Sequence, residues 1–553
     1  MFQNFPKLKS ILLLIQIFVV SSCSLAYELL LGTAASNITG NSVLAFSLSI
    51  GLYLAGLGTG AFCSQWVKNK ILHEFFVWTE TVLALVGGIC VATLYLSLVF
   101  TPYFQFVQIF LTFLVGLISG LEIPVLTRIL NINNHKSGDN KNTTTSSDFE
   151  LKGILANVLS FDYLGGLLAS VLFPLILLPY FGLVKLNFLI GLLNLCMATL
   201  GLYLFWSQIK NKIIHIFSIS IIFILLLSAT FWSSSIYNFI ENGLYRDPIV
   251  YSTQSQFWRI VVTKKGNDTR LYLNGGIQFS SQDEYRYHES LVMPALLLSS
   301  QKPTKLNVAV FGGGDGLAVT QILKFSSFLE KVSLVDIDPK MTDLAKNSEL
   351  FKNLNQNSLN SDQVQIYNRD AWAWLQEQPR NSLDLIISDL PDPDDSAIAK
   401  LYSQEFFKFA SLALKADGVL VTQSSSPYTT PKVFWAENKT LSSVFPQVIP
   451  YQAYVPSFGQ WGFHITSKQA KEQSDILKSL YSYQPEKEQL AILNSNQYID
   501  TPNLTQIFTL SPDLKTPKLS TGEKIDLNSL KINTLDNLIL IKYYTETGRE
   551  NSQ

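Results

Sequence analysis

The chain has 553 residues, more than one ordinary hydrophobic core accommodates, so at least two domains are expected. Hydrophobic residues make up 48% of the sequence and charged residues 15%, and the shortage of charge is concentrated before Tyr245. An apolar half and a polar half are therefore predicted. A net charge of -1, without a long run of Lys or Arg, excludes the basic field that a nucleic-acid partner needs. Neither a disulfide framework nor a metal site is predicted, because all four cysteines lie in apolar stretches without CxxC or Cys/His spacing: Cys23, Cys63, Cys90 and Cys196.

The first half contains stretches long enough to cross a bilayer, which takes roughly 20 apolar residues. There are seven of them, at 11–31, 43–66, 75–98, 103–126, 154–180, 186–206 and 213–232. Residues 1–235 are therefore predicted to form a transmembrane domain of about seven helices, in contact with membrane lipid. The expected location is the cell membrane, as a multi-pass protein.

Basic residues lie in alternate gaps between these stretches, such as Lys68 and Lys70, whereas the other gaps contain only Lys185. The positive-inside rule then places the N-terminus in the cytoplasm and everything after Trp232 outside. A rival interpretation of the start is a lipoprotein signal ending at Cys23, but the apolar stretch continues past that cysteine.

Carboxylates lie within or at the ends of these stretches, where a charge is costly. Two interpretations stay open. The acids are neutral and hydrogen-bond between helices, or they line a path for cations. The residues concerned are Glu28, Glu80, Glu122 and Asp162.

The polar half begins with short β-branched and aromatic runs, 257–263 and 270–274, separated by a turn around Gly266. This pattern predicts a hairpin in a small β-subdomain over residues 236–300. Next, an apolar strand at 306–311 leads into the glycine turn 312–316, and a helical pattern follows. A second strand then ends at Asp336, whose position suits an acceptor for ribose hydroxyls. Strand, glycine turn, helix, strand and acid form one nucleotide-binding βαβ unit.

Two further predicted strands end in acids, the first at Asp370-Ala371 and the second at Asp389, three residues before Asp392. Residues 301–468 are thus predicted to form a Rossmann-like, doubly wound α/β sheet of the methyltransferase type. Ligands bind at the carboxyl ends of such strands. A phosphate site would need cations, and none of these motifs contains Lys or Arg. The acids therefore favour a cationic ligand.

The same segments resemble the spermidine synthase family over about residues 250–467, and the seven preceding stretches resemble its membrane-fused members. The motifs that support the resemblance are Leu273-Asn274-Gly275-Gly276-Ile277-Gln278, Asp283-Glu284-Tyr285-Arg286-Tyr287-His288-Glu289, Gly312-Gly313-Gly314-Asp315-Gly316, Asp336-Ile337-Asp338, Asp370-Ala371, Asp389-Leu390-Pro391-Asp392-Pro393 and Gly459-Gln460-Trp461-Gly462-Phe463.

The resemblance implies transfer of the aminopropyl group of decarboxylated S-adenosylmethionine to putrescine, giving spermidine and methylthioadenosine. It implies no cofactor besides that co-substrate. Asp389 would be the catalytic acid/base residue, and Asp315 would bind the aminopropyl ammonium. The remaining donor-binding residues would be Gln278, Gly312, Gly314, Asp336, Asp370 and Ala371, and the acceptor groove would contain Tyr287, His288 and Asp392.

Two positions depart from the family pattern. Phe257-Trp258 stands where Tyr-Gln is usual, so a donor contact of Trp258 is left open. The tyrosine expected before the Gly-Gln segment does not align with 454–458. Residues 469–553 read as a polar, peripheral extension without an assigned function. The identity of the diamine and the question of a homo-oligomer stay open.

Two other functions remain as alternatives. One is an S-adenosylmethionine-dependent methyltransferase, although Asp315 would then face the donor's carboxylate with like charge. The other is a non-catalytic polyamine sensor or transporter. Trp258 and the intramembrane acids favour this alternative. The side of the membrane also stays open, because charge counting places the second half outside whereas the donor is expected in the cytoplasm.

Overall fold

The computed structural model describes residues 6–39, 42–137, 144–301, 304–468, 474–482, 484–518 and 523–550. Contacts divide the chain into two compact units, Met1–Asp247 and Pro248–Gln553. Each unit is described by itself. The division into four parts made from the sequence stays a prediction.

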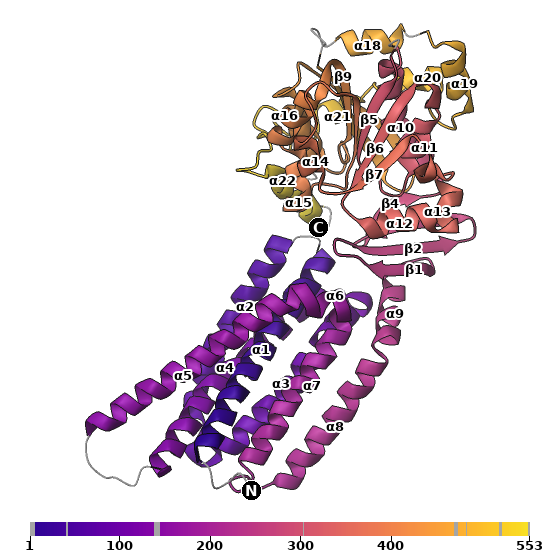
Figure 1. Ribbon diagram of the computed structural model, residues 1–553. Coiled ribbons are helices and arrows are strands. Elements are labelled where there is room, and N and C mark those ends of the chain that lie inside the picture. The colour runs from indigo at the N-terminus through magenta and orange to yellow at the C-terminus, as the bar shows by residue number, and fades with distance from the viewer. Residues whose placement is uncertain are drawn as a thin grey trace. The chain divides into compact units, whose positions relative to one another are not determined.

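The first unit is helical (Figure 1). Its helices are α1 (Pro6–Thr39), α2 (Ser42–Cys63), α3 (Leu72–Phe100), α4 (Phe104–Ser137), α5 (Thr144–Leu172), α6 (Leu178–Phe181), α7 (Leu183–Leu204), α8 (Lys212–Phe231) and α9 (Ser233–Leu244), with a π-helical segment, Phe173–Leu177, joining α5 to α6. Within the described residues, seven segments are long and apolar enough to cross a membrane, from Ile11–Ile38 to Lys212–Phe231. The predicted region of seven long apolar helices is confirmed.

Helices α2 and α4 approach each other closely because each presents two glycines four residues apart. A Cβ at Gly60 of α2 would lie 2.0 Å from the backbone oxygen of Leu117. A Cβ at Gly120 of α4 would lie 2.2 Å from the backbone oxygen of Leu57. This is the small-residue packing by which apolar helices associate where burial from water does not drive them together.

Two carboxylates of the long apolar helices are buried in this unit. Glu80 of α3 has 0% and Glu122 of α4 has 2% of its surface exposed. The Ser24 hydroxyl of α1 donates to Oε2 of Glu122 at 3.3 Å and to the Ser119 hydroxyl at 2.9 Å. Oε2 of Glu122 thus accepts a hydrogen bond from another helix, and both interpretations of these acids stay open.

The second unit starts with a four-stranded antiparallel sheet in the order β1-β2-β3-β4. Its strands are β1 (Ile249–Gln254), β2 (Arg259–Lys265), β3 (Asp268–Leu273) and β4 (Gly276–Ser280). The predicted hairpin is present as β2 and β3, which pair from Lys265 with Asp268 to Ile260 with Leu273. Gly266 makes the turn with a φ of 61°, a conformation that glycine adopts without steric cost.

A seven-stranded sheet follows, in the order β10-β11-β9-β8-β5-β6-β7. The strands are β5 (Leu306–Gly312), β6 (Leu329–Asp336), β7 (Val364–Asn368), β8 (Leu383–Asp389), β9 (Leu414–Gln423), β10 (Gln447–Val455) and β11 (Gly459–Ser467). Strands β5 to β9 run parallel, and at one edge β11 pairs antiparallel with β9 and β10 pairs antiparallel with β11. The chain order reverses at β5, between β6 and β8. Such a switch point is where open α/β sheets bind ligands.

Both faces of this sheet are covered, because alternate side chains of each strand point to opposite sides. On β5, Val308 and Val310 belong to one core with helices α10 (Glu284–Ser299), α11 (Leu317–Leu323) and α12 (Pro339–Asn347). Ala309 and Phe311 belong to the other core with α14 (Ala371–Gln376), α16 (Gln404–Ala413) and α17 (Pro431–Ser442). The predicted doubly wound α/β fold, preceded by a small β-sheet, is confirmed.

The segment after the sheet, which the sequence presents as a polar extension, packs on both faces. Its helices are α18 (Ser474–Tyr481), α19 (Lys487–Ser495), α20 (Thr501–Gln506), α21 (Pro512–Lys515) and α22 (Ile539–Glu550). Leu493 and Ile499 are buried in the first core and Leu540 in the second. The carboxylate of Glu289 on α10 accepts backbone N–H groups of Gln497, Tyr498 and Ile499.

Candidate active site

The glycine turn after β5 brings two neighbouring strand ends into close contact. Gly312 pairs with Asp389 in the sheet register, and its φ is 75°. A Cβ at Gly312 would lie 2.1 Å from the Asp389 backbone oxygen, and one at Gly314 would lie 2.6 Å from Oδ2 of Asp336. Instead, the Gly314 N–H donates to that oxygen at 3.0 Å. The turn needs glycine at both positions because a side chain would occupy the space of the acids.

Asp315 belongs to this turn, and Asp336 ends the neighbouring strand β6. Oδ1 of Asp336 accepts the backbone N–H of Asp338 at 2.8 Å, and Oδ1 of Asp315 accepts that of Leu317 at 2.9 Å. Burial, with the charge of Asp338 in addition, raises the pKa of Asp336 to about 6. Burial raises the pKa of Asp315 to about 7, and the charge of Asp389 adds to it although His288 opposes it. A bound positive charge would therefore favour the ionised form of both carboxyls.

Asp389, at the end of β8, is contacted by two adjacent side chains of α10. The Tyr287 hydroxyl donates to Oδ1 of Asp389 at 2.6 Å, and Nε2 of His288 lies 4.0 Å from Oδ2. Burial raises the pKa of Asp389, while His288 and the Tyr287 hydrogen bond act in the opposite direction. A Cβ at Gly313 would lie 2.9 Å from Oδ2, so that oxygen depends on glycine for its space.

His288 is 3% exposed and is oriented by the first turn of its own helix. Its Nδ1 lies 2.7 Å from Oε2 and 3.0 Å from the backbone oxygen of Glu284, four residues earlier. Burial lowers the pKa of His288, but the Glu284 hydrogen bond and charge outweigh it, and Asp389 and Asp315 add to them. The net effect raises this pKa to about 9. An imidazolium therefore faces Asp389 at neutral pH.

Asp392 follows in the segment after β8 and receives two hydroxyl groups. Ser425 donates to its Oδ1 at 2.7 Å, and Tyr544 of α22 donates to its Oδ2 at 3.1 Å. Burial raises the pKa of Asp392 although both hydrogen bonds oppose the rise. Tyr402 holds the same segment, since its hydroxyl donates to the backbone oxygens of Leu390 and Pro391.

Asp370 lies at the end of β7 and is already engaged on both oxygens. Oδ1 caps α14 by accepting the Trp372 N–H at 2.8 Å, and Oδ2 pairs with Lys400 at 2.6 Å. Ala371 next to it is 6% exposed and belongs to the core. Lys400 is a cation beside the acids that the motifs do not predict.

Two predicted donor-binding residues stand apart from these contacts. Gln278 of β4 donates from Nε2 to the Gly276 backbone oxygen at 3.2 Å. The Trp258 ring packs against both cores, and its backbone N–H is bound by the Ser255 hydroxyl at 2.8 Å. No described hydrogen bond joins either side chain to the acidic strand ends.

Comparisons with known proteins show which family this chain resembles. The spermine/spermidine synthase domain matches residues 284–478. The polyamine aminopropyltransferase of Leptospira interrogans is 37% identical over 534 residues, which cover 96% of this chain and 97% of the relative.

This chain belongs to the polyamine aminopropyltransferase family. Polyamine aminopropyltransferase 2 of Ralstonia nicotianae is 36% identical over 541 residues, with 97% of this chain and 98% of that protein covered. The crystal structure of spermidine synthase from Thermotoga maritima is 24% identical with a TM-score of 0.41, and it covers 48% of this chain and 86% of that one. The first two matches extend over both units, so the apolar helices belong to the matched region as well as the sheet.

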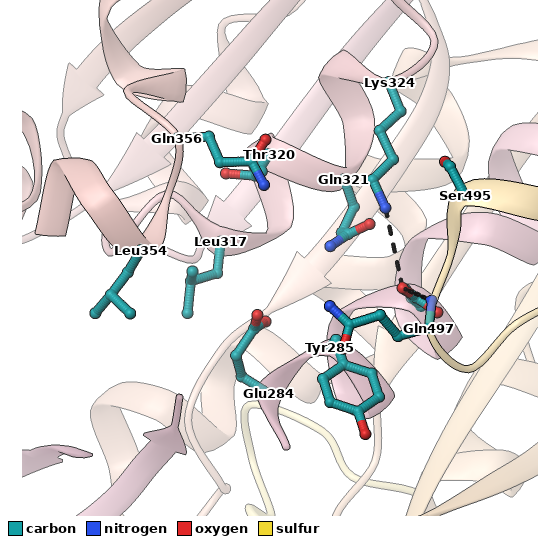
Figure 2. Close-up of a pocket in the computed structure, with 11 residues that line it drawn as sticks. Glu284, Tyr285, Leu317, Thr320, Gln321, Lys324, Leu354, Gln356, Ser495 and Gln497 are labelled. Atoms are coloured by element: carbon teal, nitrogen blue, oxygen red, sulfur yellow. Dashed lines mark hydrogen bonds and ion pairs between the residues drawn. The ribbon is translucent and has the colours of Figure 1, made fainter. Parts of the chain in front are cut away.

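A pocket of about 280 Å³ in this aminopropyltransferase fold is lined by residues of α10, among them Glu284 (Figure 2). Its wall comes from α10, α11, the turn after α13 (Glu349–Leu354) and the segment after α19. Glu284, the partner of His288, lines it, as do Lys324 and Gln321. Lys324 lies 3.9 Å from Oε1 of Glu289. Glu284 therefore connects this polar pocket to the acidic strand ends.

Sequence reasoning missed four residues around the predicted site. Glu284 could have been found, since it lies four residues before His288 on a predicted helix. Lys400, Ser425 and Tyr544 lie outside the motifs. Ser425 has a φ of 54°, which is uncommon for a residue with a side chain.

Proposed function

We propose that this chain transfers the aminopropyl group of decarboxylated S-adenosylmethionine to putrescine, giving spermidine and methylthioadenosine. The supporting observation is the group of carboxyls Asp315, Asp389 and Asp392, in which burial raises each pKa. Buried carboxyls favour ligands that bring positive charge. The donor has a sulfonium and an ammonium, and the diamine has two ammoniums.

The donor would lie across the glycine turn. Asp336 would accept hydrogen bonds from the ribose hydroxyls, and Asp315 would bind the aminopropyl ammonium. Asp370, Ala371 and Gln278 would contact the rest of the adenosyl group. Asp370 already pairs with Lys400. The adenine amino group would therefore share the Asp370 carboxylate with that lysine or displace the lysine from it.

The acceptor would lie along Tyr287, His288 and Asp392, with its reacting nitrogen at Asp389. An alkyl ammonium has a pKa near 10, so it must lose a proton before it attacks. Oδ1 of Asp389 is held by Tyr287, and Oδ2 would take that proton. Because both Tyr287 and His288 lower the pKa of Asp389, they favour its ionised form.

The reaction is an in-line displacement. The neutral nitrogen forms a bond to the propyl carbon next to sulfur, and the carbon–sulfur bond breaks with its electron pair remaining on sulfur. Methylthioadenosine leaves as a neutral thioether, and the new secondary ammonium retains the positive charge. The sulfonium charge thus moves to nitrogen, within reach of the same carboxyls.

Seven described helices are long and apolar enough to cross a membrane. We propose further that the chain is a multi-pass protein of the cell membrane. A reporter fused after Gln553, read from both sides of the membrane, identifies the side of the second unit. A cytoplasmic reporter agrees with the donor supply, and an external one with the distribution of Lys and Arg.

The test of the function is product analysis of the purified full chain with the donor and putrescine, cadaverine or spermidine as acceptor. Spermidine and methylthioadenosine in equal amounts from putrescine are expected. A methylated product from S-adenosylmethionine would support the methyltransferase alternative. Polyamine binding without turnover would support the sensor or transporter, to which the buried Glu80 and Glu122 would then belong.

A further inference from the structure

The last helix, α22, is fastened to the α/β sheet by buried contacts. Leu540 is fully buried in the core under α16 and α17. Lys432 of α17 pairs with Glu546 of α22 at 2.8 Å. Before the helix, Asn533 is fully buried and donates from Nδ2 to the backbone oxygen of Ala399 at 2.8 Å. These contacts give α22 a defined position against the segment that follows β8.

From this position, α22 places a tyrosine hydroxyl on Asp392. The 3.1 Å hydrogen bond from Tyr544 to Oδ2 joins residues 152 positions apart, and Ser425 holds Oδ1 at 2.7 Å. Two neutral donors, one on each oxygen, fix the carboxylate without neutralising it. No described ion pair joins Asp392 to a lysine, arginine or histidine. The carboxylate is therefore oriented and still able to bind a cation.

The neighbouring aromatic groups show that this hydroxyl comes from α22 specifically. Tyr543, the preceding residue of the same helix, points elsewhere and accepts the Lys531 N–H at 3.2 Å. Tyr454 of β10, before the Gly459-Gln460 segment, has 52% of its surface exposed. Burial favours the neutral acid of Asp392, whereas hydroxyl donors favour the carboxylate.

We propose that α22 supplies Tyr544 as a positioning residue of the acceptor site, where it orients Asp392 to bind the distal, non-reacting ammonium of the diamine. This rests on the proposed function, because it takes the acceptor to be a diamine anchored at Asp392. The C-terminal segment is then part of the active site. Its role is to recognise the end of the acceptor that does not react.

The experiment compares the full chain in detergent with Tyr544→Phe and with Tyr543→Phe, which removes a hydroxyl from the same helix away from Asp392. Steady-state kinetics are measured with putrescine. n-Butylamine, which has the same four-carbon chain without a distal ammonium, is measured as a competitor. Methylthioadenosine binding reports whether the donor site is intact.

Tyr544→Phe is expected to raise the KM for putrescine about tenfold, as fits loss of one hydrogen bond to a charged group. Its kcat, the inhibition constant of n-butylamine and methylthioadenosine binding should stay unchanged. Tyr543→Phe should match the wild type. Equal putrescine KM values for the two variants would overturn the proposal, as would an equal loss of putrescine and n-butylamine affinity in Tyr544→Phe. Absence of turnover by the wild type with any diamine would overturn the proposed function instead, and this inference with it.

Discussion

The Tyr287 hydroxyl donates a 2.6 Å hydrogen bond to Oδ1 of Asp389, which joins the first turns of α10 to the end of β8. The Tyr287 ring is held by Phe463 of β11, with ring centroids 5.4 Å apart. This contact leaves Oδ2 as the carboxylate oxygen that faces His288.

Replacing Asp389 with Asn should lower kcat for putrescine by about 10²- to 10⁴-fold at neutral pH, because size is kept and the base is lost. Donor binding should hardly change. Raising the pH should restore part of the rate, since more diamine arrives neutral. Steady-state kinetics from about pH 7 to 10 measure this. Asp392→Asn is the comparison and should act mainly on KM. Near wild-type turnover for Asp389→Asn would remove its catalytic role.

Replacing Tyr287 with Phe should move the acid limb of the kcat/KM profile to higher pH. The hydrogen bond lowers the pKa of Asp389, so its loss lets burial raise that pKa further. The base form then appears only at higher pH. The control is Tyr285→Phe, on the same helix, whose ring lines the neighbouring pocket. An unshifted limb with reduced kcat would mean that Tyr287 acts in another way.

Donor affinity should increase with pH up to about pH 7 and then level off, because Asp315 has a pKa of about 7 and must ionise to bind an ammonium. One coupled proton gives at most a tenfold change per pH unit. Calorimetry between pH 6 and 8 measures this. Asp315→Asn should remove the dependence. Methylthioadenosine, which lacks the aminopropyl ammonium, is the matched ligand and should show only the smaller dependence near pH 6 that the pKa of Asp336 gives.

Replacing Asp336 with Ala should weaken binding of both the donor and methylthioadenosine, since both have the ribose hydroxyls. A charge-assisted hydrogen bond contributes about 1.5–3 kcal/mol, so a loss of at least tenfold is expected. Putrescine KM should change little. Asp343→Ala, an exposed acid on α12 that contacts only Asn347 in the described hydrogen bonds, is the control. Unchanged donor affinity in a folded Asp336→Ala protein would exclude this residue from the site.

Replacing Glu284 with Gln should destabilise the protein at low pH more than at high pH. The pKa of His288 is raised from 6.5 to about 9. The stabilisation of the folded protein by protonated His288 is therefore complete below about pH 6.5 and is lost as pH rises through 9. At about 1.4 kcal/mol per pKa unit, the whole shift amounts to roughly 3 kcal/mol, to which Asp389 and Asp315 contribute besides Glu284. Thermal unfolding at pH 6 and pH 10 measures the difference from the wild type.

The matched variant for Glu284 is Glu349→Gln. Glu349 is 82% exposed and pairs with Lys352 on the surface. Such surface pairs contribute little, so this variant should show only a small loss at either pH. A Glu284→Gln defect that is the same at pH 6 and pH 10 would show that the charge of His288 is not the cause.

Local sequence features determined the framework of this protein. Apolar runs of about 20 residues define the helices of the first unit, because length and hydropathy are properties of each segment alone. The glycine turn and the acid that ends β6 were likewise readable, since parallel strands bring their carboxyl ends to one edge. Asp315, Asp336 and Asp389 were predicted at this edge, and the structure brings them there around Gly314.

Tertiary structure decided which groups surround those acids. Lys400 occupies one oxygen of Asp370, and Gln278 and Trp258 stay outside the described contacts. Tyr544 reaches Asp392 only because Leu540 and the Lys432–Glu546 pair dock α22 onto the sheet. No local periodicity encodes a contact across 152 residues, because it depends on how separately formed segments pack. The sequence therefore determined the acidic edge, and the packing of the last helix decided what orients its outermost carboxylate.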